Sequence, residues 1–133
     1  DIHGVTKGKG LQGPVKRFGV TLKSHKSEKK RRAAGNLGSW TPKKVSPTVP
    51  QKGQMGFHTR TEYNKQIMMI SSDMSKINPK DGYPHYGLVN TEFILIKGSV
   101  FGPKKRLIRI SEAFRKHEVK PTEITHISLE SKQ

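Results

Sequence analysis

The sequence predicts a mainly β protein whose folded part lies in the second half of the chain. Residues 61–133 contain 19 Leu, Ile, Val and Phe, whereas residues 1–60 contain only 11. The first half therefore lies below the roughly 20% of such residues at which a highly charged segment tends to stay unfolded by itself. We expect residues 61–133 to form a β-rich portion with a C-terminal tail, and residues 1–60 to form a basic extension.

The opening segment, residues 1–19, interleaves glycines with lysines, a composition typical of a binding loop. Residues 8–15 (GKGLQGPV) match both a dinucleotide fingerprint and the glycine-rich loop of kinases. We expect no helix to open at Gly13-Pro14, and the other kinase motifs are missing. We therefore interpret the match as coincidental. A nucleotide-dependent enzyme built on Gly8 to Gly13 is kept as a third hypothesis, which predicts saturable nucleotide binding.

The middle of the first half predicts a loop that runs out and returns. Residues 18–22 (FGVTL) alternate weakly, as in a short strand, and Ser27 can cap one or two helical turns over residues 28–34. Every face of that helix would be charged, so it would need a phosphate backbone beside it. The sequence at 38–42 (GSWTP) predicts a tight turn with Trp40 at the end of the loop.

The second half predicts strands separated by one long surface loop. Residues 61–71 (TEYNKQIMMIS) are strand-like, and residues 73–87 are rich in Pro, Gly, Asn and Asp, as expected of a loop. The best strand by β-branched and aromatic content is 91–97 (TEFILIK), and 105–111 (KRLIRIS) is expected to be its antiparallel partner.

The charge of the chain predicts a polyanionic partner. Residues 1–60 carry 14 basic and 2 acidic side chains, and the whole chain has a formal charge of +16. Uncompensated charges at that density repel one another unless phosphates neutralise them. Structured RNA is the first hypothesis, and a free, chromatin-like protein that compacts DNA is the alternative. Competition between the two nucleic acids separates them.

Trp40 is the only tryptophan, and two interpretations of it stay open. As a core residue it would need apolar neighbours, which the adjacent Ser39, Thr41 and Pro42 do not supply. As a binding residue it would pack on the bases or backbone of folded RNA.

Other classes of site have little support. The chain has no cysteine, and its 6 histidines are scattered without an i, i+4 pair, so no metal site is expected. No catalytic triad or carboxylate pair is indicated. The longest apolar runs are too short to span a bilayer. The chain opens with Asp1 and shows no signal-peptide pattern, so we expect a fragment of a longer protein.

Five motifs are spread over nearly the whole chain: residues 1–10 (DIHGVTKGKG), 13–17 (GPVKR), 35–42 (GNLGSWTP), 53–65 (GQMGFHTRTEYNK) and 98–105 (GSVFGPKK). Together they resemble the L-three family of large-subunit ribosomal proteins in its archaeal form. The resemblance covers the central and C-terminal portion of the family protein. The sequence departs from the family at Phe101, where a proline is expected.

The resemblance implies part of a translation-protein-type β-barrel, with a long basic extension that ends in a tryptophan finger at Trp40. It implies a non-enzymatic protein of the cytoplasmic ribosome, which supports assembly, contacts large-subunit rRNA and neighbouring ribosomal proteins, and reaches toward the peptidyl transferase centre. No cofactor, membrane or small-molecule substrate is expected, and any Mg²⁺ or monovalent ions would be held by the rRNA. The side chains expected to bind rRNA are Lys7, Lys9, Lys16, Arg17, Lys23, His25, Lys26, Lys29, Lys30, Arg31, Arg32, Trp40, Lys43, Lys44, Lys52, His58, Arg60, Lys104 and Lys105.

Overall fold

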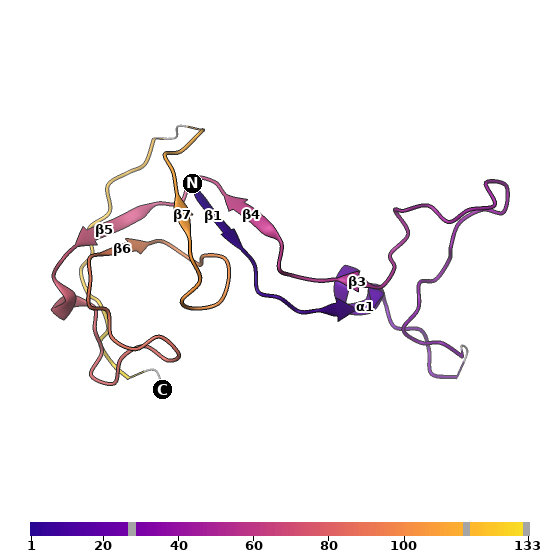
Figure 1. The fold of residues 1–133 in the computed structure, drawn as a ribbon, viewed down its shortest axis with the longest axis horizontal. Coiled ribbons are helices and arrows are strands. Elements are labelled where there is room, and N and C mark those ends of the chain that lie inside the picture. The colour runs from indigo at the N-terminus through magenta and orange to yellow at the C-terminus, as the bar shows by residue number, and fades with distance from the viewer. Residues whose placement is uncertain (27–28, 116–117, 132–133) are drawn as a thin grey trace. The chain divides into compact units, whose positions relative to one another are not determined.

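The computed structural model describes residues 1–26, 29–115 and 118–131, and its regular elements are mainly strands (Figure 1). The strands are β1 (Ile2–Val5), β2 (Leu11–Gln12), β3 (Gly53–Gln54), β4 (Thr59–Glu62), β5 (Ile67–Ser71), β6 (Phe93–Ile96) and β7 (Arg109–Ile110). The helices are α1 (Pro14–Phe18) and the 3₁₀ helix η1 (Met74–Lys76). A mainly β fold is confirmed, and the strands of the described residues form separate small sheets without a closed barrel.

Contacts between residues divide the chain into two compact units. Unit 1 comprises Asp1–Thr6 and Thr59–Gln133, and unit 2 comprises Lys7–His58. The predicted domains, residues 1–60 and 61–133, were drawn from the distribution of charge in the sequence. They differ from the two units, which are defined by contacts, and they stay a prediction. The two units are described separately below.

The three-stranded sheet of unit 1 is built around β1, with the order β4-β1-β7. Ile2 lies opposite Glu62 on β4 and Ile110 on β7, and both pairings are antiparallel. Ile2 is only 1% exposed. A strand from the start of the predicted extension thus forms the centre of the folded unit.

The Asp1 carboxylate connects this sheet to the segments around it. It accepts hydrogen bonds from the backbone N–H groups of Asn64 and Phe114, each at 2.9 Å. His3 lies next along β1, and its ring nitrogens are each 3.0 Å from a hydroxyl oxygen, of Thr61 and of Ser111. The start of β1 is therefore fixed on both sides by polar contacts.

The second sheet of unit 1 shows that one predicted pairing is wrong. Strand β6, predicted over 91–97, pairs antiparallel with β5 instead of with residues 105–111, so that Ile94 lies opposite Ile70. Residues 105–111 supply β7, whose partner is β1. The loop after β6 causes this outcome because it leads the chain away from β6 and toward the end of β1.

Gly102 and Arg106 hold that loop. Gly102 has φ +87°, and a Cβ on it would lie 2.8 Å from the carbonyl oxygen of Val5. Arg106 Nη1 donates to the carbonyl oxygens of Val5, at 3.0 Å, and Thr6, at 2.8 Å. Two close contacts with the end of β1 therefore place β7 beside that strand.

The loop between β5 and β6 is irregular, as predicted. Asp73 caps η1 by accepting from the Ser75 backbone N–H at 3.2 Å. Ile77, which follows η1, is 6% exposed, and its carbonyl accepts from the Tyr83 hydroxyl. Asn78 and Val89 exchange hydrogen bonds of 2.9 and 3.0 Å, which close the loop.

Unit 2 contains a helix, α1, that we did not expect. Gly13 is the N-cap of α1 and Pro14 is its first residue, so a helix does open at Gly13-Pro14. Proline suits the first helical position because its missing N–H would have no partner there. Phe18 ends the helix and Gly19 follows with φ +71°, so the strand predicted over 18–22 is not formed.

The two legs of unit 2 pair at β2 and β3, with Leu11 opposite Gln54. Beyond this pairing, the described residues between 20 and 50 contain no helix or strand. The helix predicted over 28–34 begins at residues outside the described ranges, since Ser27 and Glu28 are not described, and residues 29–34 form turns and bends. Unit 2 is thus a short paired base that carries a long irregular loop.

Candidate nucleic-acid interface

The sequence places most of the uncompensated charge of the chain in unit 2. Residues 7–58 contain 13 Lys and Arg and a single acidic residue, Glu28. The remaining residues contain 13 Lys and Arg and 9 Asp and Glu. Because unit 2 contains a single acidic residue, its positive charge is not balanced within the unit, which favours a partner that supplies negative charge.

Nearly all of the predicted rRNA-binding side chains are exposed. The exceptions are half-buried: Arg17, Lys23 and His58. Most of the set falls in unit 2, whereas Arg60, Lys104 and Lys105 belong to unit 1. Exposed ammonium groups on flexible stems are suited to contacting phosphates as point charges. The assignment of these residues to RNA contacts stays a prediction.

Some members of the set contact the protein itself. Arg17 donates to the carbonyl oxygens of Gln51 and Gln54, and Arg31 Nε donates to that of Lys23 at 3.2 Å. In unit 1, Lys104 Nζ donates to the Pro84 carbonyl oxygen. Such partners are neutral, so these side chains keep their charge while part of their donor capacity is used.

Trp40 is 85% exposed, which rules out the interpretation of Trp40 as a core residue of this chain as described. It lies beside a hollow of about 470 Å³, lined by Leu37, Gly38, Ser39, Trp40, Lys43, Lys44 and Val45. Leu37 is 53% exposed and Val45 is 48% exposed. The tip of the loop therefore combines an indole face, aliphatic walls and ammonium groups.

The backbone forms a hydrogen-bonded turn over residues 40–43, which overlaps the turn predicted over 38–42 but lies further along the chain. The Lys43 N–H donates to the Trp40 carbonyl oxygen at 3.0 Å. Gly38 has φ +109°, a conformation that side chains rarely adopt, and its N–H donates to Asn36 Oδ1 at 3.0 Å. These local bonds shape the backbone on either side of the exposed indole.

Sequence reasoning missed Leu37 and Val45 as parts of this tip. Their signal was weak, because each stands alone among polar and small residues and neither belongs to an apolar repeat. Only their convergence around the turn makes them walls of the hollow.

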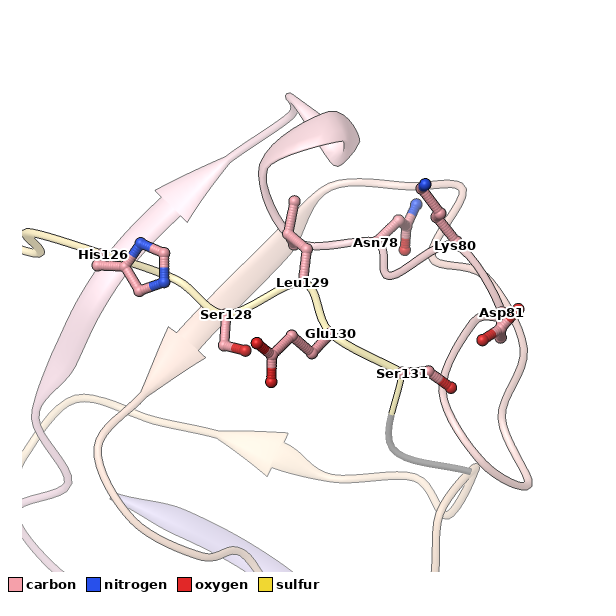
Figure 2. A pocket seen from close by; sticks show the side chains of 8 residues that line it. All are labelled: Asn78, Lys80, Asp81, His126, Ser128, Leu129, Glu130 and Ser131. Carbon is pink, nitrogen blue, oxygen red and sulfur yellow. The ribbon is translucent and has the colours of Figure 1, made fainter.

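A further hollow, of about 520 Å³, lies in unit 1 (Figure 2). Residues of the loop after η1 face residues of the C-terminal tail across it (Figure 2), and the lining is Asn78, Lys80, Asp81, His126, Ser128, Leu129, Glu130 and Ser131. The lining mixes one ammonium with two carboxylates, so it does not favour a polyanion. Among the described residues, no group of three or more His, Asp or Glu is placed to hold a metal ion.

No helix within the described ranges is long and apolar enough to cross a membrane.

Comparison with known proteins identifies the family. The family model described as Ribosomal protein L3 matches residues 1–131. The chain belongs to the ribosomal protein L3 family. This family membership confirms the resemblance seen in the motifs, and it also confirms that the chain is not an enzyme, because members of this family are structural ribosomal proteins. The nucleotide-dependent enzyme suggested by residues 8–15 is therefore wrong.

Curated archaeal relatives agree with this assignment. Proteins called "Large ribosomal subunit protein uL3" are 52% identical in Methanocorpusculum labreanum, 52% in Archaeoglobus fulgidus and 50% in Methanocaldococcus jannaschii. Each alignment covers 100% of this chain and 41% of the relative. The chain thus spans less than half the length of these members of the ribosomal protein L3 family.

Proposed function

We propose that this chain is part of a structural component of the large ribosomal subunit and that unit 2 binds large-subunit rRNA. The observation that carries the proposal is the charge of residues 7–58, where 13 basic side chains face a single acidic one. Membership in the ribosomal protein L3 family supports rRNA as the polyanion rather than chromosomal DNA. The partners would be the rRNA and neighbouring proteins of the large subunit, and the location would be the ribosome.

The loop of residues 20–50 would act as a finger that enters folded rRNA and reaches toward the peptidyl transferase centre. Trp40 would stack at its tip, where a base on an aromatic ring contributes roughly 1–3 kcal/mol. Lys43 and Lys44, which line the same hollow, would neutralise the adjacent phosphates. In this role Trp40 positions RNA and takes no part in chemistry.

Unit 1 would contribute to a translation-protein-type β-barrel and would support subunit assembly. Support comes from the apolar side chains that the small sheets leave exposed, such as Ile70 at 64% and the opposite Ile94 at 43%. A full-length structure of an archaeal relative in which the matching side chains face solvent would contradict the barrel.

The salt dependence of binding tests the proposal. With about 6–10 phosphate contacts, affinity for a large-subunit rRNA fragment should fall about 10³–10⁵-fold between 50 and 200 mM salt. A flat salt dependence would refute binding through the charge of unit 2. Duplex DNA that competes as well as the rRNA fragment would favour the DNA-compacting hypothesis. Co-sedimentation with the large subunit after a high-salt wash tests the location.

Trp40→Ala separates the role of the tip from that of the charge. The slope of log K against log salt should stay nearly unchanged, because no phosphate contact is lost, while the chemical reactivity of rRNA at the tip should rise. The double variant Lys43→Ala, Lys44→Ala is the matched control and should lower the slope by about 2. A lower slope in Trp40→Ala, with intact folding, would contradict a stacking role.

A further inference from the structure

Arg17 lies where the two legs of unit 2 meet, and its guanidinium faces the returning leg. Nε donates to the Gln54 carbonyl oxygen at 3.1 Å, and Nη1 donates to the Gln51 carbonyl oxygen at 3.1 Å. The guanidinium carbon also lies 4.8 Å from the centroid of the Phe18 ring. One side chain at the end of α1 thus bonds to a segment more than thirty residues further along the chain.

Gly53 allows this close approach. A Cβ on Gly53 would lie 2.8 Å from Arg17 Cζ and 2.9 Å from Nη1, which is closer than such atoms approach in proteins. Gly53 is not among the glycines with positive φ, so its backbone conformation is open to any residue. The close contact at this position therefore comes from the guanidinium, the movable end of the Arg17 side chain, and not from the backbone conformation of Gly53.

The position of these bonds gives them a role in the loop. Helix α1, which contains Arg17, precedes the long irregular loop, and β3, which contains Gln54, follows it (Figure 1). Gln51 lies just before β3 in the sequence. Hydrogen bonds between Lys23 and Arg31 join two residues of the loop itself. The direction in which the loop leaves and returns is thus set at its base, by the pairing of β2 with β3 and by Arg17.

We propose that Arg17 is a positioning residue, a latch that fixes the base of the loop carrying Trp40, rather than one of the side chains that neutralise phosphates. The guanidinium suits this role because its planar fork of N–H donors bonds two carbonyl oxygens at once, which a lysine ammonium does not do with the same geometry. The functional benefit of this latch rests on the proposed rRNA-binding function. Its structural part is tested on the free chain, without RNA.

Amide hydrogen exchange on the full chain tests the latch. In Arg17→Lys the charge is kept and the fork is lost, so exchange at the Met55 and Gly19 amides should accelerate by about tenfold or more. Lys16→Ala is the matched control. It removes a neighbouring exposed charge on the same helix and should leave exchange at both amides at the wild-type rate.

Gly53→Ala tests the same contact from the other side. The new methyl should displace the guanidinium and accelerate exchange as Arg17→Lys does, although no charged residue is altered. Gly13→Ala is the matched control, because a Cβ there would meet no atom within 4 Å and the backbone φ is −76°. In an Arg17→Ala background, Gly53→Ala should have little further effect, since the clashing group is gone.

RNA binding then separates positioning from phosphate contact. Arg17→Ala should leave the slope of log K against log salt within error of the wild type, whereas a lost phosphate contact would lower it by about 0.9. Wild-type exchange in Arg17→Lys, or additive effects of Arg17→Ala and Gly53→Ala, would overturn the latch. A failure of rRNA binding with intact exchange effects would instead overturn only the proposed function.

Discussion

Gly56 gives the sharpest test of how the two legs of unit 2 are held together. Its φ is +72°, and a Cβ added to it would lie 1.9 Å from the carbonyl oxygen of Lys7 and 3.2 Å from the backbone nitrogen of Lys9. Both obstacles are backbone atoms, which cannot swing aside as a flexible side chain can. Gly56→Ala should therefore push the legs apart at this point.

The expected cost has a conformational part and a steric part. An alanine in the left-handed region costs about 1–2 kcal/mol. Separation of the legs breaks the bonds from Lys9 N to Met55 O, at 2.9 Å, and from Phe57 N to Lys7 O, at 3.3 Å, each of which contributes about 0.5–1.5 kcal/mol. Gly56→Ala should thus destabilise the paired base by about 2–5 kcal/mol.

Hydrogen exchange at the Lys9 and Met55 amides measures this cost. At 1.4 kcal/mol per factor of ten, protection should fall by a factor of about 30 to several thousand. Gly10→Ala is the matched control, because Gly10 has φ +64° but no atom within 4 Å of an added Cβ, so only the conformational cost applies. If protection in Gly56→Ala fell no further than in Gly10→Ala, the close approach to Lys7 would be refuted.

Two predictions concern carboxylates of unit 1. Asp1→Ala should lower the free energy of unfolding by about 2–3 kcal/mol in urea titrations, because the Asn64 and Phe114 amides lose their acceptor. Asp1→Asn should lower the free energy of unfolding by less. An unchanged urea midpoint in Asp1→Ala would contradict this role of the carboxylate. At η1, the hydrogen bond from the Ser75 hydroxyl chiefly lowers the pKa of Asp73. The cap is therefore fully present above the ordinary pKa of an aspartate and is lost as pH falls through the lowered value. An NMR titration of the Ser75 amide should show this transition, and Asp73→Asn should abolish it.

The sequence predicted the existence of strands better than their partners. Thr91 to Lys97 stood out by β-branched content and became β6, but its partner is β5 rather than the next strand along the chain. Local propensity acts within a few residues, whereas pairing is decided by which backbone segments close contacts bring together. Here the approach of Gly102 and Arg106 to the end of β1 decides it, and no short-range pattern contains that information.

At the candidate interface, the sequence indicated the exposed indole and the concentration of positive charge. It did not indicate which basic side chains bond to the protein itself and which are exposed for contacts with RNA. The exposure of Trp40 agrees with its immediate sequence neighbours, Ser39, Thr41 and Pro42, which offer no apolar core around it. The helix at Pro14 was not predicted, although proline suits a first helical position. The contact of Arg17 with Gln51 and Gln54 depends on folding and could not be read locally.

The division between arginine and lysine follows from their chemistry. Arg17 and Arg106 each bond two backbone carbonyl oxygens of a distant segment, where a planar fork of donors fixes orientation at little cost in entropy. Exposed lysines such as Lys43 and Lys44 carry a compact, hydrated charge, which adapts to a phosphate without fixed geometry. An arginine that bonds to backbone carbonyl oxygens still adds to the net positive charge and to the electrostatic field of the molecule. The net charge of the chain therefore overstates the number of side chains that can contact RNA phosphates.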